Sequence, residues 1–518
     1  MRVLFASAEV FPLAKTGGLA DVSAALPFAL DHLGADVRIV MPGYTAALDC
    51  AEAKMAAIPL GEFGAAGDVF LIPARLPDSG LPLWLIDSPR LFRRDGSLYL
   101  DAEGRDWPDN ALRFGTFSQA VTRLALGDAT TSWRPQVVHA NDWHVGLVPA
   151  LLAAHDGPRP PTVLTVHNLA FQGVFPAEVY PTLGLPPDWF NPDTVEFYGQ
   201  VSMLKAGIRF ADRITTVSPT YAQEIMTAEF GCGLEGFLKA RAANLVGILN
   251  GIDEQIWSSQ DPTSVPYPFS TRDLSGKRLC KAALQSELGL TASPDAPIIA
   301  FLGRLTEQKM ADMLPDLLPV LTELGAQFVV CANGDAAIEQ RLAAMAASRP
   351  DSVAVQIGYE EGLARRILAG ADILAAPSRF EPCGLTQMYA MRYGTIPIVR
   401  NVGGLQDTVI PYEPSGPTAT TATGFMFSEP SLAGLADAMA RACLHYQKPV
   451  AWRAMQLRAL HQDFGWTRSA QRYLALYRDL MPAGHETLQP AAFRRERRAP
   501  RLQAANGDDY LRHAKAGG

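Results

Sequence analysis

Two groups of residues have the types and spacing needed to bind a diphosphate. The first is the loop Lys15-Thr16-Gly17-Gly18-Leu19, which follows an apolar run at the start of the chain and leads into a segment with helical spacing. Paired glycines allow backbone N–H groups to approach a ligand, and a helix N-terminus beside a lysine favours a diphosphate. The loop matches neither the dinucleotide fingerprint nor the phosphate loop of nucleotide hydrolases. Because a glycine turn between a strand and a helix is ordinary in α/β proteins, the loop alone favours a structural interpretation.

The second group lies in the other half of the chain, where Arg304 and Lys309 are five positions apart after an apolar run. We expect both in the loop that follows a strand. Loops at the carboxyl ends of parallel strands bind ligands in open α/β sheets, and an arginine with a lysine can neutralise the charge on a departing diphosphate. The alternative is a solvent-exposed basic turn without a ligand.

Two further residues have chemistry suited to a sugar or a reacting centre. Glu381 follows another strand-like run and lies beside a glycine turn, where it could bind sugar hydroxyls or simply begin a helix. His167 ends the apolar run Thr162–Val166, so its side chain or carbonyl can point into a cleft. His139 is interpreted as structural. The sequence has no His-Glu-x-x-His or Asp-x-Asp pattern, so we expect no metal site and no cofactor.

The composition is typical of a soluble enzyme with two large domains. The chain has 518 residues, of which 48% are hydrophobic and 19% charged, and this length exceeds the roughly 100–200 residues of one domain. A formal net charge of −8 provides no basic surface for nucleic acid. No apolar stretch reaches the ~18 residues of a membrane span. The six cysteines form no Cys-x-x-Cys pair, which favours a reducing cytoplasm over a disulfide framework.

Apolar runs alternate with amphipathic runs in both halves, which predicts parallel βαβ units and an α/β fold. Helical spacing is found in Leu19–Leu33, Arg113–Leu126 and Ser202–Ala211. The strand-like ranges are Arg2–Ser7, Asp36–Met41, Val69–Pro73, Pro82–Asp87, Gln136–His139, Thr162–Val166 and Arg213–Val217, followed in the second half by Pro297–Leu302, Gln327–Cys331, Ser352–Ile357, Asp372–Ala376 and Ile396–Val399.

This alternation divides the chain into two doubly wound, Rossmann-like domains, residues 1–260 and 276–481. The segment 261–275 between them begins with prolines and small polar residues and is predicted to be the hinge. Residues 482–518 contain little that could fill a core and are expected to form a disordered tail. We interpret the arginine cluster at 494–498 as a solvated charge run.

Ordered motifs along residues 1–481 resemble those of the bacterial glycogen synthases and plant starch synthases. These motifs are Lys15–Val22, Asp106–Asn110, Asn141–His144, Thr165–Gly173, Thr215–Tyr221, Glu229–Gly236, Ile248–Asp253 and Ser378–Gln387. The resemblance implies a GT-B fold, in which two Rossmann-like domains face each other across a deep cleft. The first domain would be the acceptor side and the second the nucleotide-sugar donor side, with the last helix crossing back.

The resemblance also implies a reaction and a set of partners. The expected reaction is the transfer of glucose from ADP-glucose to the non-reducing end of glycogen or another α-1,4-glucan primer, with retention of configuration and release of ADP. No cofactor, nucleic acid or membrane is expected to take part.

The motifs assign expected roles to individual residues. In the first domain, Lys15 with Gly17 and Gly18 would face the diphosphate, Asp21 would belong to the donor site, Asp106 and Asn250 would lie near the transferred glucose or the acceptor, and His167 would lie at the reacting face. In the second domain, Arg304 and Lys309 would stabilise the leaving diphosphate, Glu381 with Cys383, Gly384, Leu385 and Thr386 would hold the sugar, and Tyr359 would lie beside the nucleoside.

Three positions depart from the family pattern. Met310 replaces the glycine that usually follows Lys309, and a side chain there could either crowd the phosphates or point away. Asn141 replaces the histidine that usually precedes Asp142, and Cys232 replaces an aromatic residue.

Other functions remain open from the residues. A transferase of the same fold could use UDP-glucose or a small acceptor, and an inactive relative could bind glucan without releasing a nucleoside diphosphate. A pyridoxal-dependent phosphorylase shares the fold type, but nothing in the sequence indicates a Schiff-base lysine.

Overall fold

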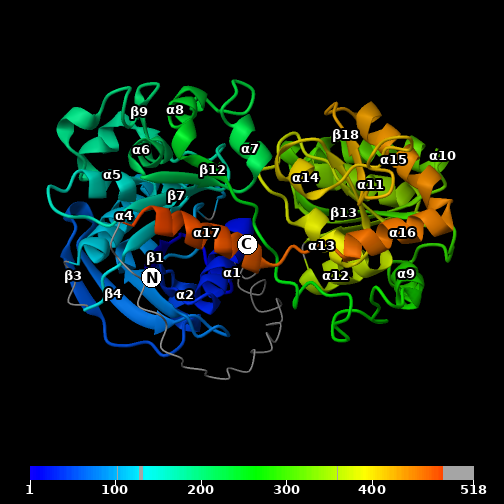
Figure 1. The fold of residues 1–518 in the computed structure, drawn as a ribbon, viewed down its shortest axis with the longest axis horizontal. Helices are drawn as coiled ribbons and strands as arrows, with labels where there is room; N and C mark the ends of the chain where they lie inside the picture. The colour runs from blue at the N-terminus through cyan, green and yellow to red at the C-terminus, as the bar shows by residue number, and fades with distance from the viewer. Residues whose placement is uncertain (102, 128–131, 359, 482–518) are drawn as a thin grey trace. The chain divides into compact units, whose positions relative to one another are not determined.

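A computed structural model describes residues 1–101, 103–127, 132–358 and 360–481 and divides the chain into two compact units (Figure 1). Unit 1 combines Met1–Gly251 with the segment that begins at Trp466, and unit 2 comprises Ile252–Gly465. Residues 261–275, predicted as the hinge, fall within unit 2. The predicted tail at 482–518 lies outside the described residues.

Within the described residues, the main sheet of unit 1 has the strand order β12-β11-β7-β6-β1-β2-β5-β4-β3 (Figure 1). Its strands are β1 (Arg2–Ala6), β2 (Asp36–Pro42), β3 (Ile58–Glu62), β4 (Asp68–Arg75), β5 (Pro82–Asp87), β6 (Val137–Asn141), β7 (Thr162–Val166), β11 (Arg213–Thr216) and β12 (Leu245–Gly247). The predicted strands of this half are confirmed, although β3 and β12 were not predicted.

The expectation of parallel units throughout this half is wrong at one edge. Strand β4 runs antiparallel to both β3 and β5, while the pairs from β12 to β5 are parallel. The connections on either side of β4 span only residues 63–67 and 76–81. A parallel crossover needs a dozen or more residues, so these short links permit only antiparallel pairing.

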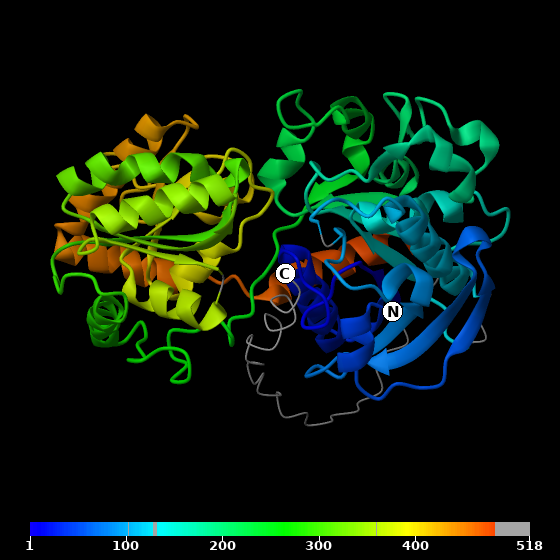
Figure 2. The ribbon, with the colours of Figure 1, turned by 180° about the vertical axis from the view of Figure 1, so that it is seen from behind.

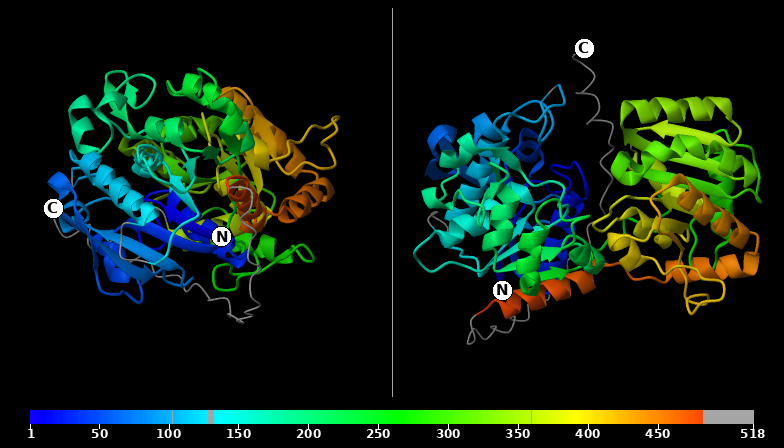
Figure 3. Two further views of the ribbon diagram at one scale, coloured as in Figure 1. Left: turned by 60° about the vertical axis from the view of Figure 1, so that its left-hand side comes forward. Right: turned by 90° about the horizontal axis from the view of Figure 1, so that it is seen from above.

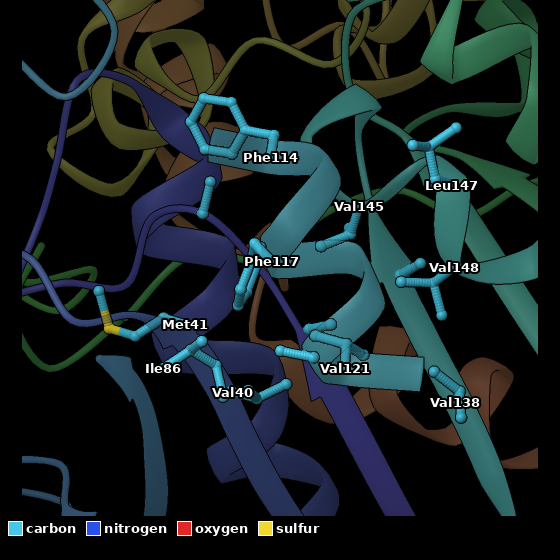
Figure 4. Packing of buried hydrophobic residues seen from close by; sticks show 14 of the residues in the cluster. Val40, Met41, Ile86, Phe114, Phe117, Val121, Val138, Val145, Leu147 and Val148 are labelled. Atoms are coloured by element: carbon cyan, nitrogen blue, oxygen red, sulfur yellow. The ribbon is translucent and has the colours of Figure 1, made fainter. Parts of the chain in front are cut away.

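Helices cover both faces of this sheet, because alternate residues of its buried strands point to opposite sides. On one face, α4 (Asn110–Leu126) presents Phe114, Phe117 and Val121 at helical spacing, and Figure 4 shows Val121 between Val40 and Val138. The other face carries α1 (Gly18–His32) and α17 (Trp466–Asp479), which contact each other (Figure 3). The other α-helices and strands described in unit 1 are α2 (Thr45–Cys50), α3 (Pro89–Phe92), α5 (Leu147–Ala153), α6 (Met203–Phe210), α7 (Pro219–Glu224), α8 (Glu235–Ala240), β8 (Val174–Pro176), β9 (Glu196–Phe197) and β10 (Gln200–Ser202).

The described part of unit 2 contains one parallel sheet with the order β15-β14-β13-β16-β17-β18, covered by helices on both faces (Figure 2). Its strands are β13 (Ile298–Leu305), β14 (Gln327–Gly334), β15 (Val353–Ile357), β16 (Ile373–Ala376), β17 (Ile396–Arg400) and β18 (Phe425–Phe427). Its helices are α9 (Ser275–Glu287), α10 (Leu318–Glu323), α11 (Ala336–Ser348), α12 (Glu361–Gly370), α13 (Thr386–Arg392), α14 (Gly403–Thr408), α15 (Leu432–Tyr446) and α16 (Pro449–Leu460).

Strand order reverses between β1 and β6 among the parallel strands of unit 1 and between β13 and β16 in unit 2. Open α/β sheets bind ligands outside the carboxyl ends of the strands at such a reversal. The loops that follow these four strands are therefore the expected ligand-binding loops.

Among the helices that the structure describes, none has the length and apolar character required to span a bilayer.

Candidate functional site

In unit 1 the predicted glycine loop is held in place by a residue that the sequence did not single out, Glu9. The Glu9 side chain is almost fully buried, and its Oε2 accepts hydrogen bonds from the backbone N–H groups of Thr16 at 2.7 Å and Gly17 at 3.3 Å. Its Oε1 accepts from the hydroxyls of Thr16 at 2.5 Å and Tyr99 at 2.6 Å. One carboxylate thus fixes the loop, because hydrogen bonds to an ionised acceptor are the strong ones.

The loop leaves room for a ligand at Gly17. A Cβ atom built on Gly17 would meet no other atom within 4 Å, so packing within the protein does not require glycine there. Helix α1 begins at Gly18, one residue before its predicted start, and Lys15 Nζ lies 2.7 Å from Asp21 Oδ1 in its first turn. Both side chains of this ion pair are about one-third exposed, so the lysine remains available to an anion.

A chain of contacts leads from Glu9 to His167. The Tyr99 ring stacks on His144 with ring centroids 4.7 Å apart, and His144 stacks on Trp143 at 4.0 Å. The preceding residue, Asp142, accepts a 2.7 Å hydrogen bond from the backbone N–H of His167 through Oδ1. The structure therefore brings together the glycine loop after β1, the segment after β6 and His167 after β7.

Asn141 fixes the protonation of His167. Its Nδ2 donates to the Ala6 carbonyl at 3.0 Å, so its Oδ1 is an acceptor and the His167 Nε2, 3.0 Å away, is the donor. Burial lowers the pKa of His167 to about 3, which keeps the ring neutral at physiological pH. The departure from histidine at position 141 therefore supplies an acceptor that selects one neutral tautomer, with Nδ1 unprotonated.

Asp142 is the second residue that sequence reasoning missed. Burial raises the pKa of its carboxyl to about 7, despite the backbone hydrogen bonds it receives, and its φ of 61° is in the left-handed region. Shifted pKa values and strained backbone both concentrate at functional sites. The available signal was its position inside a family motif directly after a predicted strand.

Two other predicted residues of unit 1 are Asp106, which lies at the surface, and Asn250, which follows the edge strand β12. Asp106 is exposed and forms an isolated antiparallel bridge with Leu100, one residue beyond Tyr99. Asn250 is buried after β12, and its Oδ1 accepts no hydrogen bond from any described group. Asp106 is thus linked to the Glu9 cluster through the segment that carries Tyr99, and Asn250 keeps a free acceptor.

In unit 2 the structure brings Lys309 and Glu381 into direct contact. Lys309 Nζ forms an ion pair with Glu381 Oε2, which also accepts a 3.0 Å hydrogen bond from Ser378 Oγ. Glu381 is almost fully buried, while a quarter of the Lys309 side chain is exposed. Both residues line one pocket with Gly384 and Thr386, beside the strand-order reversal. A cation and a carboxylate therefore lie side by side where this sheet is expected to bind a ligand.

An ion pair outside this pocket holds its two loops together. Arg379 contacts Asp312 through two parallel N–H···O bonds of 2.8 Å. The Arg379 backbone N–H also donates to the Gln308 carbonyl at 2.8 Å, and Gln308 Nε2 donates to the Phe380 carbonyl at 3.3 Å. These contacts fix the turn that carries Lys309 against the segment that carries Glu381.

The remaining predicted residues of unit 2 differ in their setting. Arg304 lies on β13 and is exposed, so its predicted place in the loop after the strand is wrong, because β13 continues to pair with β14 as far as Leu305. Gly384 has φ +70°, and a Cβ there would lie 2.5 Å from Gln387 Oε1. Cys383 is buried, Leu385 is the N-cap of α13, and Thr386 is its first residue. Tyr359 lies outside the described residues.

Met310 points into unit 2. Its side chain is fully buried and does not line the pocket of Lys309 and Glu381 in the described structure, so it does not crowd that pocket. Its backbone has φ 53° and ψ 27°, a left-handed conformation that glycine adopts more readily. The family glycine is thus replaced at a cost in backbone strain and with a gain in packing.

Replacing Met310 with glycine is therefore expected to destabilise the fold while leaving the donor site intact. Loss of a buried methionine side chain costs about 2–5 kcal/mol, more than the ~1–2 kcal/mol of strain that glycine relieves. We expect Met310→Gly to lower the thermal midpoint and to keep the donor KM within a few-fold of the parent value. Thermal unfolding and initial rates measure both. A donor KM that is tenfold lower in Met310→Gly than in the parent protein would instead show that the methionine weakens donor binding.

Comparison with known proteins covers both units. Residues 2–240 match the family model "Starch synthase catalytic domain", and residues 289–454 match "Glycosyl transferases group 1". The chain is 52% identical to a glycogen synthase of Burkholderia thailandensis over 92% of this chain and 90% of that protein. It is 49% identical to one of Paramagnetospirillum magneticum over 93% and 98% of the two chains.

Solved structures agree with these sequence relationships. The catalytic domain of starch synthase IV from Arabidopsis thaliana, bound to ADP and acarbose, matches with a TM-score of 0.82 and 32% identity over 92% of this chain and 99% of that one. A sucrose-phosphate synthase from Thermosynechococcus elongatus matches at a TM-score of 0.56 and 19% identity, a likeness of fold alone. The predicted two-domain α/β glycosyltransferase fold of the GT-B type is confirmed.

Proposed function

The chain belongs to the family of bacterial glycogen synthases and plant starch synthases and is a glycosyltransferase, and we propose that it elongates glycogen with glucose from ADP-glucose. The observation that carries the proposal is the Lys309–Glu381 pair at the strand-order reversal of unit 2. A cation beside a buried carboxylate suits a ligand with a diphosphate at one end and sugar hydroxyls at the other.

The reaction breaks the bond between the glucose C1 atom and the diphosphate oxygen and forms a bond from C1 to the 4-hydroxyl oxygen of the glucan end. For retention of configuration, the acceptor attacks from the face that the diphosphate leaves, and the acceptor proton passes to the departing phosphate oxygen. The protein then supplies positioning and charge stabilisation rather than a nucleophile.

Each unit contributes residues to this reaction. In unit 2, Lys309 and Arg304 stabilise the negative charge of the leaving ADP, and Glu381 binds hydroxyls of the transferred glucose. In unit 1, Lys15 and the open backbone at Gly17 take part in diphosphate binding. The cations carry the charge of the leaving group, so the proposal requires no metal and no cofactor.

Four further roles rest on the family resemblance. Neutral His167, with the N–H of Nε2 committed to Asn141, lies at the reacting face. Asp21 belongs to the donor site, where it orients Lys15, and Asp106 and Asn250 lie near the transferred glucose or the acceptor. We also propose a cytoplasmic location, because Cys280, Cys331, Cys383 and Cys443 are buried thiols, a form that a reducing compartment preserves.

Radiolabelled ADP-glucose and UDP-glucose, each with and without glycogen, test the proposed function. We expect label in polymer only with ADP-glucose and primer. Glu381→Gln should abolish the incorporation, whereas Glu323→Gln, at an exposed glutamate at the end of α10, should retain it. If label were transferred only from UDP-glucose, or only to a small acceptor, the proposal would be wrong and the protein would be a different transferase. Glycogen binding without release of ADP would identify an inactive glucan-binding relative.

A further inference from the structure

A β-hairpin in unit 1 has a two-residue turn, and one of these two residues, Tyr198, has an aromatic side chain and an unfavourable backbone conformation. Strands β9 and β10 are joined by Tyr198 and Gly199, with φ values of +49° and +80°. Such primed turns suit the twist of a hairpin, but they favour asparagine or glycine because a side chain costs energy at positive φ. The Glu196 carboxylate holds the turn by accepting a hydrogen bond from the Gly199 N–H. Strain of this kind persists where the side chain has a use.

The Tyr198 ring is both supported and open. The residue is 81% exposed, yet its ring packs in a T-shaped arrangement with the Phe197 ring, with centroids 4.8 Å apart and an interplanar angle of 82°. Gly233 lies close to both rings, since a Cβ atom there would lie 3.1 Å from Phe197 Cζ and 3.3 Å from Tyr198 Cε2. The ring is thus braced by two neighbours, while most of its surface faces solvent.

The hairpin is joined to the loop that follows His167. Strand β10 pairs with β8, which begins directly after residues 167–173. Gln172 in that loop donates from Nε2 to the Cys232 carbonyl at 2.8 Å, next to Gly233. The same loop exposes a second aromatic side chain, Phe171, which is 54% exposed. Two exposed aromatic residues therefore lie on segments that are linked to each other by this hydrogen bond and by strand pairing, and the first of them is four residues from His167.

We propose that Tyr198, together with Phe171, is a stacking platform for the acceptor α-glucan beyond its reacting end. Pyranose rings present apolar C–H faces, which pack on exposed aromatic rings, and a long glucan extends past the residues that bind its terminal sugar. The platform adds binding energy remote from the chemistry, so it acts on acceptor affinity and on the preference for long acceptors. This inference rests on the proposed function, because it names the binding surface of the same acceptor.

Tyr198→Asn tests the platform without weakening the hairpin, because asparagine is favoured at this turn position. We expect its KM for glycogen to rise about five- to tenfold relative to its KM for ADP-glucose, and its preference for maltoheptaose over maltotriose to shrink. Tyr198→Phe keeps the ring and should restore both values. Tyr267→Asn, at a tyrosine of unit 2 that is 46% exposed, is the matched control and should change neither.

Unchanged glycogen KM in Tyr198→Asn overturns the proposal, as does an equal rise in Tyr267→Asn or a failure of Tyr198→Phe to restore binding. Co-sedimentation with glycogen in the absence of donor separates the platform from catalysis. If wild-type protein binds glycogen through Tyr198 but incorporates no glucose, the platform stands and the proposed function fails. If it incorporates glucose with no dependence on Tyr198, the function stands and the platform fails.

Discussion

Lys309→Ala should lower kcat by about 100- to 1000-fold with little effect on glycogen binding, because the lysine is placed to stabilise charge that develops on the leaving diphosphate. Removing one preorganised electrostatic partner of a transition state costs this much in enzymes that rely on charge stabilisation. The substitution also leaves the buried Glu381 carboxylate with Ser378 as its remaining partner among the contacts above. Steady-state rates at saturating glycogen and co-sedimentation of glycogen measure the two effects separately.

Two variants complete the Lys309 experiment. Lys309→Arg keeps the positive charge with a different shape and should recover part of the activity, since a guanidinium cannot reproduce a point charge. Lys448→Ala, at an exposed lysine before α16, should behave like the parent enzyme. A variant of Lys309 that loses glycogen binding while keeping its kcat would contradict the role given to this lysine.

Glu9→Ala should reduce kcat/KM for ADP-glucose by about 100-fold, although Glu9 itself touches no substrate in the proposed reaction. The carboxylate accepts hydrogen bonds from four donors, which fix the loop of Lys15 and Gly17 and the ring of Tyr99. Hydrogen bonds to a charged group contribute about 1.5–3 kcal/mol each, and a 100-fold loss corresponds to ~2.7 kcal/mol. The loss should appear mainly as a higher donor KM, because a disordered loop must be ordered again on binding.

Glu9→Gln keeps one carbonyl acceptor and should lose less than Glu9→Ala, while Glu62→Ala, at an exposed glutamate on β3, should lose nothing. Thr16→Ala removes a single hydroxyl donor and should have a smaller effect than either change at Glu9. Circular dichroism and thermal unfolding check that each variant is folded. If folded Glu9→Ala kept its donor KM, the carboxylate would not position the loop.

Most strands of the two main sheets could be predicted from the sequence, because the apolar run of a buried strand and the spacing of an amphipathic helix are local properties. The ranges predicted for β5 and β7 agree with the structure at both ends, and α1 and α6 begin within one residue of their predicted starts. The same local patterns placed Lys15, His167 and Glu381 after strands, where parallel sheets expose ligand sites. Family motifs then supplied their roles, which no spacing could have given.

The contacts that hold these residues could not be predicted from the sequence, because their partners are distant in the chain. Glu9 and Tyr99 are 90 positions apart, and nothing local to Glu9 indicates that its carboxylate meets that hydroxyl. The tautomer of His167 depends on Asn141, which reaches it because β6 and β7 are neighbours in the sheet. The direction in which the Met310 side chain points likewise follows from its backbone geometry rather than from its residue type. Periodicity identifies which face of an element is buried, whereas strand order and loop geometry decide which side chains meet.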